Sequence, residues 1–320
     1  MQARRFRQLT AGLTAAAALC AACIASAANA ADAPVALETR EVAPGVFIHE
    51  GKVRSWGADG NEDVANLAFV IGSRCVAVID SGGSPRVGEA LRAAIERRTR
   101  LPVCYLINTH VHPDHVLGNS AFAALQPRPQ FIGHARLASA LGARAPFYLA
   151  TLERELGTVA STAWIVPPDR AVDGSAELDL GDRILELRAW PTAHTDNDLS
   201  VFDVRTRTLL TGDLLFSSHL PVIDGKLLGW LQVSAELAKT DAVRVVPGHG
   251  AVSTDWPAVL EPQTRYLGAL RDQVRAAIQA GDTITQTVDR LSADAVEHWQ
   301  LVDEFHRRNI TAAYAELEWE

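Results

Sequence analysis

The sequence lacks any apolar run after residue 31 that is long enough to cross a bilayer, because a spanning helix needs about 20 mostly apolar residues. It also lacks repeats of the length found in solenoid proteins, and no low-complexity linker interrupts it after the N-terminal region. A hydrophobic content of 48 % with 21 % charged residues is typical of a well-packed globular protein. We therefore expect one folded domain with two β-rich halves and no membrane span.

Basic residues are too few for a protein that binds nucleic acid. The chain has 30 Lys and Arg against 38 Asp and Glu, which gives a formal net charge of −8. Binding to phosphates needs clustered Lys and Arg. The charge balance therefore excludes nucleic acid as a partner; the partner that we expect is a small-molecule substrate.

The first thirty residues have the pattern of a secretory signal peptide. Arg4, Arg5 and Arg7 precede an apolar run over residues 11–25, and Ala28-Asn29-Ala30 provides a small-residue cleavage site. We expect residues 1–30 to be removed near Ala30 and the mature protein to be periplasmic or secreted. The residues after Arg4-Arg5 fit a twin-arginine signal poorly, which favours the general export route.

Cysteine is scarce, and only Cys75 and Cys104 remain after the signal peptide. They precede two candidate site residues, Asp80 and His110, at similar depths in their own expected strands. If those strands are neighbours, the sulfurs could form a disulfide, which an exported protein can keep. Such a bond would contribute roughly 3–4 kcal/mol by the chain-entropy estimate. Two buried free thiols are the alternative.

The densest group of metal-binding side chains lies between Asn108 and His115. This segment follows the apolar run 103–107, an expected buried strand, and contains His110, His112, Asp114 and His115. Alternation places His110 and His112 on the same side, and a turn at Pro113 can bring the other two to face them. Three imidazoles and a carboxylate exceed the needs of one small ion, so the pattern indicates two divalent metals with ligands suited to zinc. A polar surface loop is the alternative.

Further candidates follow other expected strands. They are Asp80, His194, Asp213 and His249, after strands expected at 74–79, 183–190, 208–210 and 243–246. Open α/β sheets place their sites at the carboxyl ends of strands. Each residue alone could be a cap or a turn, but small neighbours would let all of them crowd around one centre.

The remaining patterns outline the rest of the fold. Strands are also expected at 46–48, 67–71, 131–132 and 199–204, and helices around 87–95, 263–280 and 284–320. Strand 74–79, the helix after it and strand 103–107 form a βαβ unit, which implies parallel pairing. Residues 143–164 have the character of an insertion with no assigned role. We place the main domain at 31–283 and a helical C-terminal extension packed on it at 284–320.

The motif His-x-His-x-Asp-His, followed by single His, Asp and His residues at strand ends, resembles the metallo-β-lactamase fold hydrolases. The resemblance covers about residues 42–280 and includes all five motifs of that superfamily. It implies an α/β fold, a four-layer αββα sandwich, with two metal ions at one edge of two facing sheets. The helical C-terminal extension would be added to this sandwich.

The resemblance also assigns roles by position. It implies two zinc sites, with His110, His112 and His194 as ligands of the first and Asp114, His115 and His249 as ligands of the second. Asp213 would bridge the two ions, and Asp80 would support the ligand loops. A simple turn residue is the alternative for Asp80, and iron or manganese are alternatives to zinc.

The implied reaction is the hydrolysis of an ester, thioester, lactone or amide by a hydroxide that bridges the metals. Asp114 would orient this nucleophile and pass on its proton. Two zinc ions, two aspartates and one hydroxide give the centre a formal charge of about +1, which favours an anionic leaving group or substrate carboxylate.

A narrower resemblance rests on residues 74–83, Asp224-Gly225, Gly229-Trp230 and 308–314. These segments look like those of the exported quinoprotein relay system zinc metallohydrolases. That resemblance implies a periplasmic quinoprotein dehydrogenase as a partner.

Substrate contacts are expected from Trp56, in a glycine-rich flap at 54–61, and from His219 and Trp230, in a loop over 216–230. The alternatives are a packed flap anchor for Trp56 and a solvated loop histidine for His219.

Three other functions use similar residues. An iron-dependent persulfide dioxygenase shares the ligand set but usually has one metal. A β-lactamase is less favoured, because Asp213 stands where antibiotic-degrading enzymes have Ser or Cys. A non-catalytic quinoprotein accessory protein would keep the metal for structure, but structural zinc sites are closed cages of four ligands.

Overall fold

The computed structural model describes residues 35–157, 159–292, 296 and 299–320. The expected signal peptide therefore lies outside the described residues. Within these ranges no helix is long and apolar enough to span a membrane.

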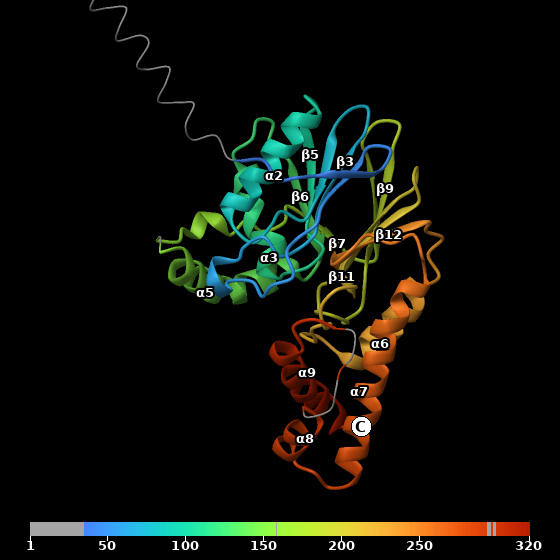
Figure 1. Cartoon of the computed structure of the whole chain (residues 1–320). Coiled ribbons are helices and arrows are strands. Elements are labelled where there is room, and N and C mark those ends of the chain that lie inside the picture. Colours follow the sequence, from blue (N-terminus) through green and yellow to red (C-terminus); the bar gives the residue numbers. More distant parts are fainter. Residues whose placement is uncertain (1–34, 158, 293–295, 297–298) are drawn as a thin grey trace, which may run out of the picture. The chain divides into compact units, whose positions relative to one another are not determined.

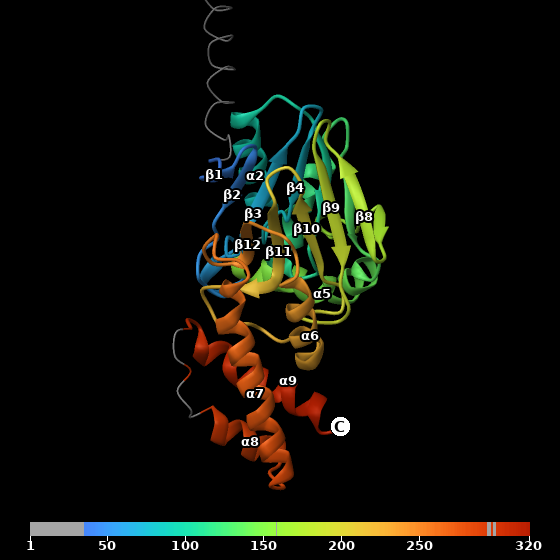
Figure 2. The same ribbon diagram turned by 90° about the vertical axis from the view of Figure 1, so that its right-hand side faces the viewer.

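Two β-sheets form the centre of the fold (Figure 2). In the described part of the chain the first sheet has seven strands in the order β1-β2-β3-β4-β5-β6-β7, and the second has five in the order β12-β11-β10-β9-β8. The first contains β1 (Arg40–Ala43), β2 (Val46–His49), β3 (Leu67–Ile71), β4 (Val76–Ile79), β5 (Val103–Ile107), β6 (Gln130–His134) and β7 (Arg170–Val172). The second contains β8 (Ser175–Asp179), β9 (Ile184–Ala189), β10 (Leu199–Asp203), β11 (Thr208–Phe216) and β12 (Arg244–His249).

The βαβ unit expected from the sequence is present. Strand β4 leads through helix α2 (Pro85–Arg98) to β5, and the two strands pair in parallel. Ser84 caps the helix by accepting a hydrogen bond from the Val87 amide, and Pro85 occupies its first turn. Val87, Leu91 and Ile95 recur at helical spacing, so the helix buries one face against the sheet. Parallel pairing brings the carboxyl ends of β4 and β5 to the same edge.

The two sheets face each other across an apolar core. Ile48, Val70 and Ile79 from the first sheet pack with Leu187 and Val201 from the second. Each sheet therefore buries the inward face of its alternating strands.

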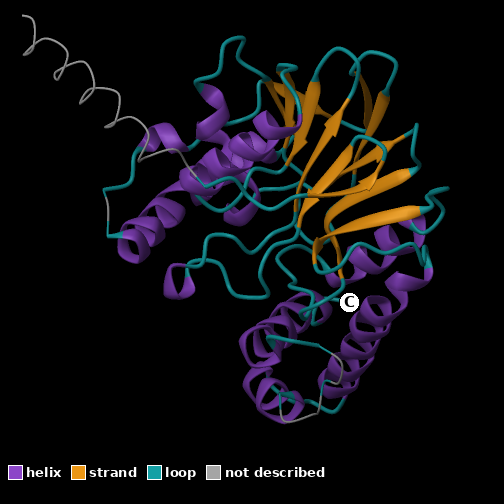
Figure 3. Cartoon of the chain, turned by 45° about the horizontal axis from the view of Figure 1, so that its top comes forward, coloured by secondary structure: helices purple, strands orange, loops and turns teal. Residues whose placement is uncertain are grey.

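Helices cover the outer face of the first sheet and pack at the β11–β12 end of the second (Figure 3). On the first sheet, Leu91 of α2 and Phe122 of α4 (Ser120–Ala123) pack against Phe69. On the second, helices α6 (Leu227–Leu237) and α7 (Glu261–Gln279) pack against Leu209 and Val245. The predicted four-layer αββα sandwich is confirmed.

The C-terminal helices α8 (Ile284–Leu291) and α9 (Val302–Leu317) pack on α7 (Figure 1). Asn309 of α9 is fully buried and fixes this packing. Its side chain donates to the Pro221 carbonyl at 2.6 Å and accepts from the Ile223 amide at 3.0 Å. Helix α9 is thereby attached to the loop between β11 and α6.

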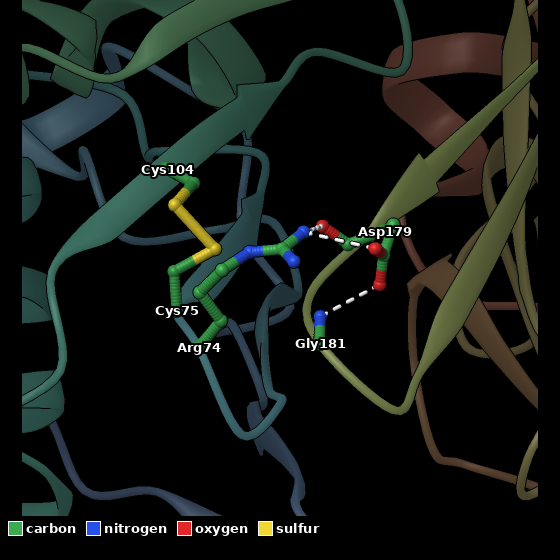
Figure 4. The surroundings of a disulfide bond; sticks show 5 residues. All are labelled: Arg74, Cys75, Cys104, Asp179 and Gly181. Carbon is green, nitrogen blue, oxygen red and sulfur yellow. Dashed lines mark hydrogen bonds and ion pairs between the residues drawn. A yellow bond between two sulfur atoms is a disulfide. The ribbon is translucent and has the colours of Figure 1, made fainter.

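Cys75 and Cys104 form a disulfide between the starts of β4 and β5, with their Cα atoms 5.8 Å apart (Figure 4). Next to it, Arg74 donates to the carbonyl and the carboxylate of Asp179, at 2.7 and 3.0 Å. Asp179 ends β8 in the other sheet, so this ion pair connects the two sheets at the edge where the disulfide lies.

Three segments differ from the sequence-based expectations. Residues 143–164 do not form a structural unit of their own, because helix α5 (Leu137–Leu156) begins before them and continues through most of them. The expected loop 216–230 is shorter, because β11 continues to Phe216 and α6 begins at Leu227. Strands β11 and β12 include Asp213 and His249 and do not stop before them.

Candidate metal centre

The seven expected ligands meet at one edge of the sandwich. His110 and His112 follow β5, and Asp114 and His115 lie in the short helix α3 (Pro113–Val116). The other three come from the second sheet: His194 from the loop after β9, Asp213 from β11 and His249 from the end of β12. Both sheets thus contribute to a single site.

The side chains fall into two groups, each with ligand atoms within 4.8 Å of one another. The first contains His110, His112, His194 and Asp213, and the second contains Asp114, His115 and His249.

Asp213 lies between the groups. Its Oδ2 is 3.4 Å from His194 Nε2 in the first group and 3.3 Å from His249 Nε2 in the second. Its Oδ1 is 3.2 Å from His115 Nε2. Gly248 makes room for this carboxylate, because a Cβ at that position would lie only 1.8 Å from Asp213 Oδ1.

The donor atoms fit a bound metal. His110 Nε2, His115 Nε2 and Asp213 Oδ1 are buried and have no hydrogen-bond partner of acceptable geometry. Buried polar atoms without a partner are costly and rare in folded proteins. Imidazole nitrogens and carboxylate oxygens are ligands of zinc and similar divalent ions, which would satisfy all three atoms.

In each of the five imidazoles, the ring nitrogen that points away from the other ligands is held by a hydrogen bond. The partners are Thr109 Oγ1 for His110 Nδ1 (3.1 Å), Asp224 Oδ2 for His112 Nε2 (3.0 Å), Asp80 Oδ2 for His115 Nδ1 (2.8 Å), the Val222 carbonyl for His194 Nδ1 (2.7 Å) and the Val64 carbonyl for His249 Nδ1 (2.9 Å). An acceptor on one ring nitrogen places the proton there and leaves the lone pair on the other. The carboxylate and carbonyl partners therefore orient four of the five rings for metal binding.

Asp80 connects β4 to the ligand loop. Its backbone is left-handed, with φ at +59°. Its carboxylate accepts from the amide and the hydroxyl of Thr109, both at 2.8 Å, as well as from His115. These bonds fix the start of the ligand loop and one ligand ring together.

Burial and the two carboxylates set the charges of the ligands. Burial lowers the pKa of His194 to about 3, which leaves this imidazole neutral. Burial also opposes the charged form of His249, but Asp213 and Asp114 outweigh it and raise the pKa to about 9. Burial would raise the pKa of Asp114, yet His115 and His249 lower it to about 2, so this carboxylate is ionised at neutral pH.

Comparison with known proteins identifies the family. Residues 60–249 match the family model of the metallo-β-lactamase superfamily. The chain belongs to the metallo-β-lactamase superfamily. A search of curated proteins found no significant match to this chain.

Solved metallo-β-lactamases share the fold at low sequence identity. The enzyme TMB-1 is 22 % identical, with a TM-score of 0.56 over 73 % of this chain and 98 % of its own. The metallo-β-lactamase from Pontibacter korlensis is 19 % identical, with a TM-score of 0.58 over 72 % and 99 %. DIM-1 is 16 % identical, with a TM-score of 0.57 over 73 % and 98 %. This chain thus has the hydrolase-type fold of the superfamily.

Asp224 is a site residue that the sequence did not indicate. It lies in the loop between β11 and α6, where it accepts from His112, from Arg144 of α5 at 2.9 Å and from Arg308 of α9 at 3.2 Å. Burial would raise its pKa, but the bond from His112 and the charge of Arg144 lower it well below the usual range. The Asp-Gly pair is the only local signal, since Gly225 lets this loop approach the His194 loop, where a Cβ would lie 2.4 Å from the Ala193 carbonyl.

A cleft of about 610 Å³ lies over both ligand groups of this superfamily member. Ligands from both groups form part of its lining, together with the flap, helix α5, the loop after β11 and helix α9. Trp56 of the flap lines it and is also anchored, because its Nε1 donates to the Gly83 carbonyl at 3.0 Å. Trp56 is therefore a packed flap anchor, and its contact with the substrate stays a prediction.

The other two expected substrate contacts turn out differently. His219 lines the cleft but is only 4 % exposed, so it is not a solvated loop histidine. Trp230 is fully buried in α6 and donates to the Leu214 carbonyl at 3.1 Å. Its ring packs behind His194, with centroids 5.2 Å apart. The expectation that Trp230 contacts the substrate is wrong, because no part of its side chain is accessible.

Proposed function

We propose that this protein is an exported dinuclear zinc hydrolase that cleaves an ester, thioester, lactone or amide bond. The observation that carries the proposal is the position of Asp213, whose two oxygens lie within 3.4 Å of nitrogens from both ligand groups. A carboxylate in this position is suited to hold two ions side by side.

The residues of the chain would divide the work as follows. One ion would be held by His110, His112, His194 and Asp213. The other would be held by Asp114, His115 and His249, together with Asp213. Zinc supplies a water whose pKa is lowered to about 7 and polarises a carbonyl oxygen. Asp114 is ionised and lines the cleft, so its carboxylate can hold the attacking water and accept its proton. Asp80 and Asp224 keep His115 and His112 in place.

Export and the possible partner complete the proposal. The N-terminal pattern of arginines, apolar run and Ala28-Asn29-Ala30 supports export to the periplasm, and a disulfide is compatible with that compartment. The narrower resemblance supports a link to a periplasmic quinoprotein dehydrogenase. Calorimetric titration with a purified dehydrogenase of this class tests that link.

Metal content and turnover on a substrate panel test the central proposal. We expect two zinc ions per chain and hydrolysis of at least one thioester, lactone or ester in a panel that also contains β-lactams. His112→Ala should abolish metal-dependent turnover, whereas His49→Ala should retain it, because His49 lies in β2 and bonds to Asp63 and the Glu38 carbonyl.

Each rival function gives a different result. If the chain binds one iron and consumes oxygen when a persulfide is supplied, the protein is a dioxygenase and not a hydrolase. A panel response limited to β-lactams would identify a β-lactamase. A fully metal-loaded chain that turns over no member of the panel would favour the accessory protein.

A further inference from the structure

Two arginines beside the metal centre share a single carboxylate. Arg144 of α5 and Arg308 of α9 both donate to Asp224, and Arg144, Arg308 and Asp224 all line the cleft. Neither arginine forms another ion pair with a described residue. The trio therefore carries one positive charge more than negative.

Both guanidinium groups retain donors for a ligand. A guanidinium has five N–H donors, and each of these two makes one hydrogen bond to Asp224. Their side chains are 33 % and 52 % exposed, while the carboxylate that joins them is 26 % exposed. Asp224 thus holds the two arginines next to each other without using up their capacity to bind an anion.

The other charged residues of the cleft do not neutralise the excess positive charge of Arg144, Arg308 and Asp224. Asp114 and Asp213 are metal ligands under the proposed function, so bound ions would offset them. Glu155 is paired with Arg154, at 2.9 Å. Arg54 also lines the cleft, so the lining carries an excess of positive charge that suits an anionic ligand.

Apolar side chains line the same cleft. Phe147 of α5 is 67 % exposed, and Phe305 of α9 and Trp56 of the flap are partly exposed. An exposed phenylalanine in a cleft favours an apolar acyl or aryl group as its partner. The two arginines and the two phenylalanines come from the same two helices, α5 and α9, so one ligand can contact both kinds of side chain.

We propose that Arg144 and Arg308 form a binding site for a carboxylate of the substrate, and that the hydrolysed molecule is an amphipathic carboxylic acid. The planar fork of arginine suits carboxylate oxygens, and charge-assisted bonds of this kind are the strong ones. The carboxylate would lie at the arginines, the apolar part against Phe147 and Phe305, and the scissile bond over the metal ligands. The inference rests on the proposed function for that last position. Arg308 lies outside the region matched by the family model, residues 60–249, so the C-terminal extension would add specificity to a shared centre.

The test uses zinc-loaded protein and matched thiols. Mercapto carboxylic acids with two to six carbons and the corresponding amides are titrated by calorimetry. The thiolate anchors both probes at zinc, and only the acid can bind the arginines. We expect one chain length at which the acid binds about tenfold or more tightly than its amide. Arg144→Gln and Arg308→Gln should each reduce this preference to about threefold or less, and Arg308→Lys should reduce it partly.

Arg154→Gln is the matched control, because Arg154 is on α5, lines the same cleft and has its own acidic partner. It should keep the full preference for the acid. Unchanged melting temperatures of the variants show that the fold is intact.

Two other outcomes would overturn the inference. If acid and amide bind equally to the wild type, or if the preference survives in the Arg144→Gln/Arg308→Gln double variant, the carboxylate site is absent and the zinc centre remains. If no thiol of either series binds, the proposed zinc centre fails and the inference fails with it.

Discussion

Asp224 illustrates how a residue without metal-binding spacing can orient a candidate metal ligand. Its carboxylate accepts from His112 Nε2, on the side of the ring opposite to the first ligand group. A hydrogen bond at this position fixes the tautomer and the orientation of a ligating imidazole. The same carboxylate is held by arginines from two helices, so the orientation of His112 depends on packing far from it in the sequence.

We therefore predict that replacement of Asp224 lowers metal affinity at the first ligand group only. Asp224→Ala should weaken zinc binding at the first group by about 10–100-fold and leave the second group nearly unchanged, because His115 and His249 have other partners. Stepwise zinc titration with a competing chelator measures both affinities.

Asp241→Ala is the control for this change, since Asp241 is exposed and pairs with Arg207. Equal weakening of both zinc sites in Asp224→Ala would show a general structural effect and contradict the positioning role.

At the scale of elements, the sequence indicates what is encoded locally and misses what depends on tertiary contacts. The spacing of His110, His112, Asp114 and His115 and the periodicity of α2 are local, and both are found as expected. Helix α6 was missed because Asp224-Gly225 and Gly229 suggest a loop.

The extended ends of β11 and β12 were missed for a related reason. Gly212 and Pro247-Gly248 are poor strand residues, yet the two strands pair in parallel through them with register shifts. The ion pairs of Arg144 and Arg308 with Asp224 have no sequence signal, because only the fold brings α5 and α9 to the same carboxylate.

Helix α9 predicts a coupling between the C-terminal extension and the metal centre. Asn309→Ala would leave the buried Pro221 carbonyl and Ile223 amide without their partner, which should lower the free energy of unfolding by about 2–4 kcal/mol. The same loop holds Val222 and Asp224, so zinc affinity at the first group should also fall. Urea unfolding and zinc titration measure the two effects.

Thr311→Ala serves as the control, because Thr311 is an exposed residue of the same helix. A loss of stability in Asn309→Ala without any change in zinc affinity would contradict the coupling.

At the scale of the whole molecule, the candidate metal centre joins the two sheets at one edge. Ligands that bind only the folded chain stabilise it by mass action. Removal of metal with a chelator should therefore lower the melting temperature by about 5–10 °C, and two equivalents of zinc should restore it. Differential scanning calorimetry checks this expectation.

In Asp213→Asn, zinc should raise the melting temperature only slightly, because the residue expected to bridge the two ions loses its charge. A melting temperature that does not respond to zinc in the wild type would argue against a metal shared by the two sheets.

The origin of the ligands has a consequence for the order of maturation. His110 and His115 belong to one sheet, whereas His194, Asp213 and His249 belong to the other. Neither half of the chain alone supplies the complete set of ligands for two ions. Under the proposed function, zinc capture would be a late event, after the halves have docked, and the metal bound would be one available in the compartment where folding is completed.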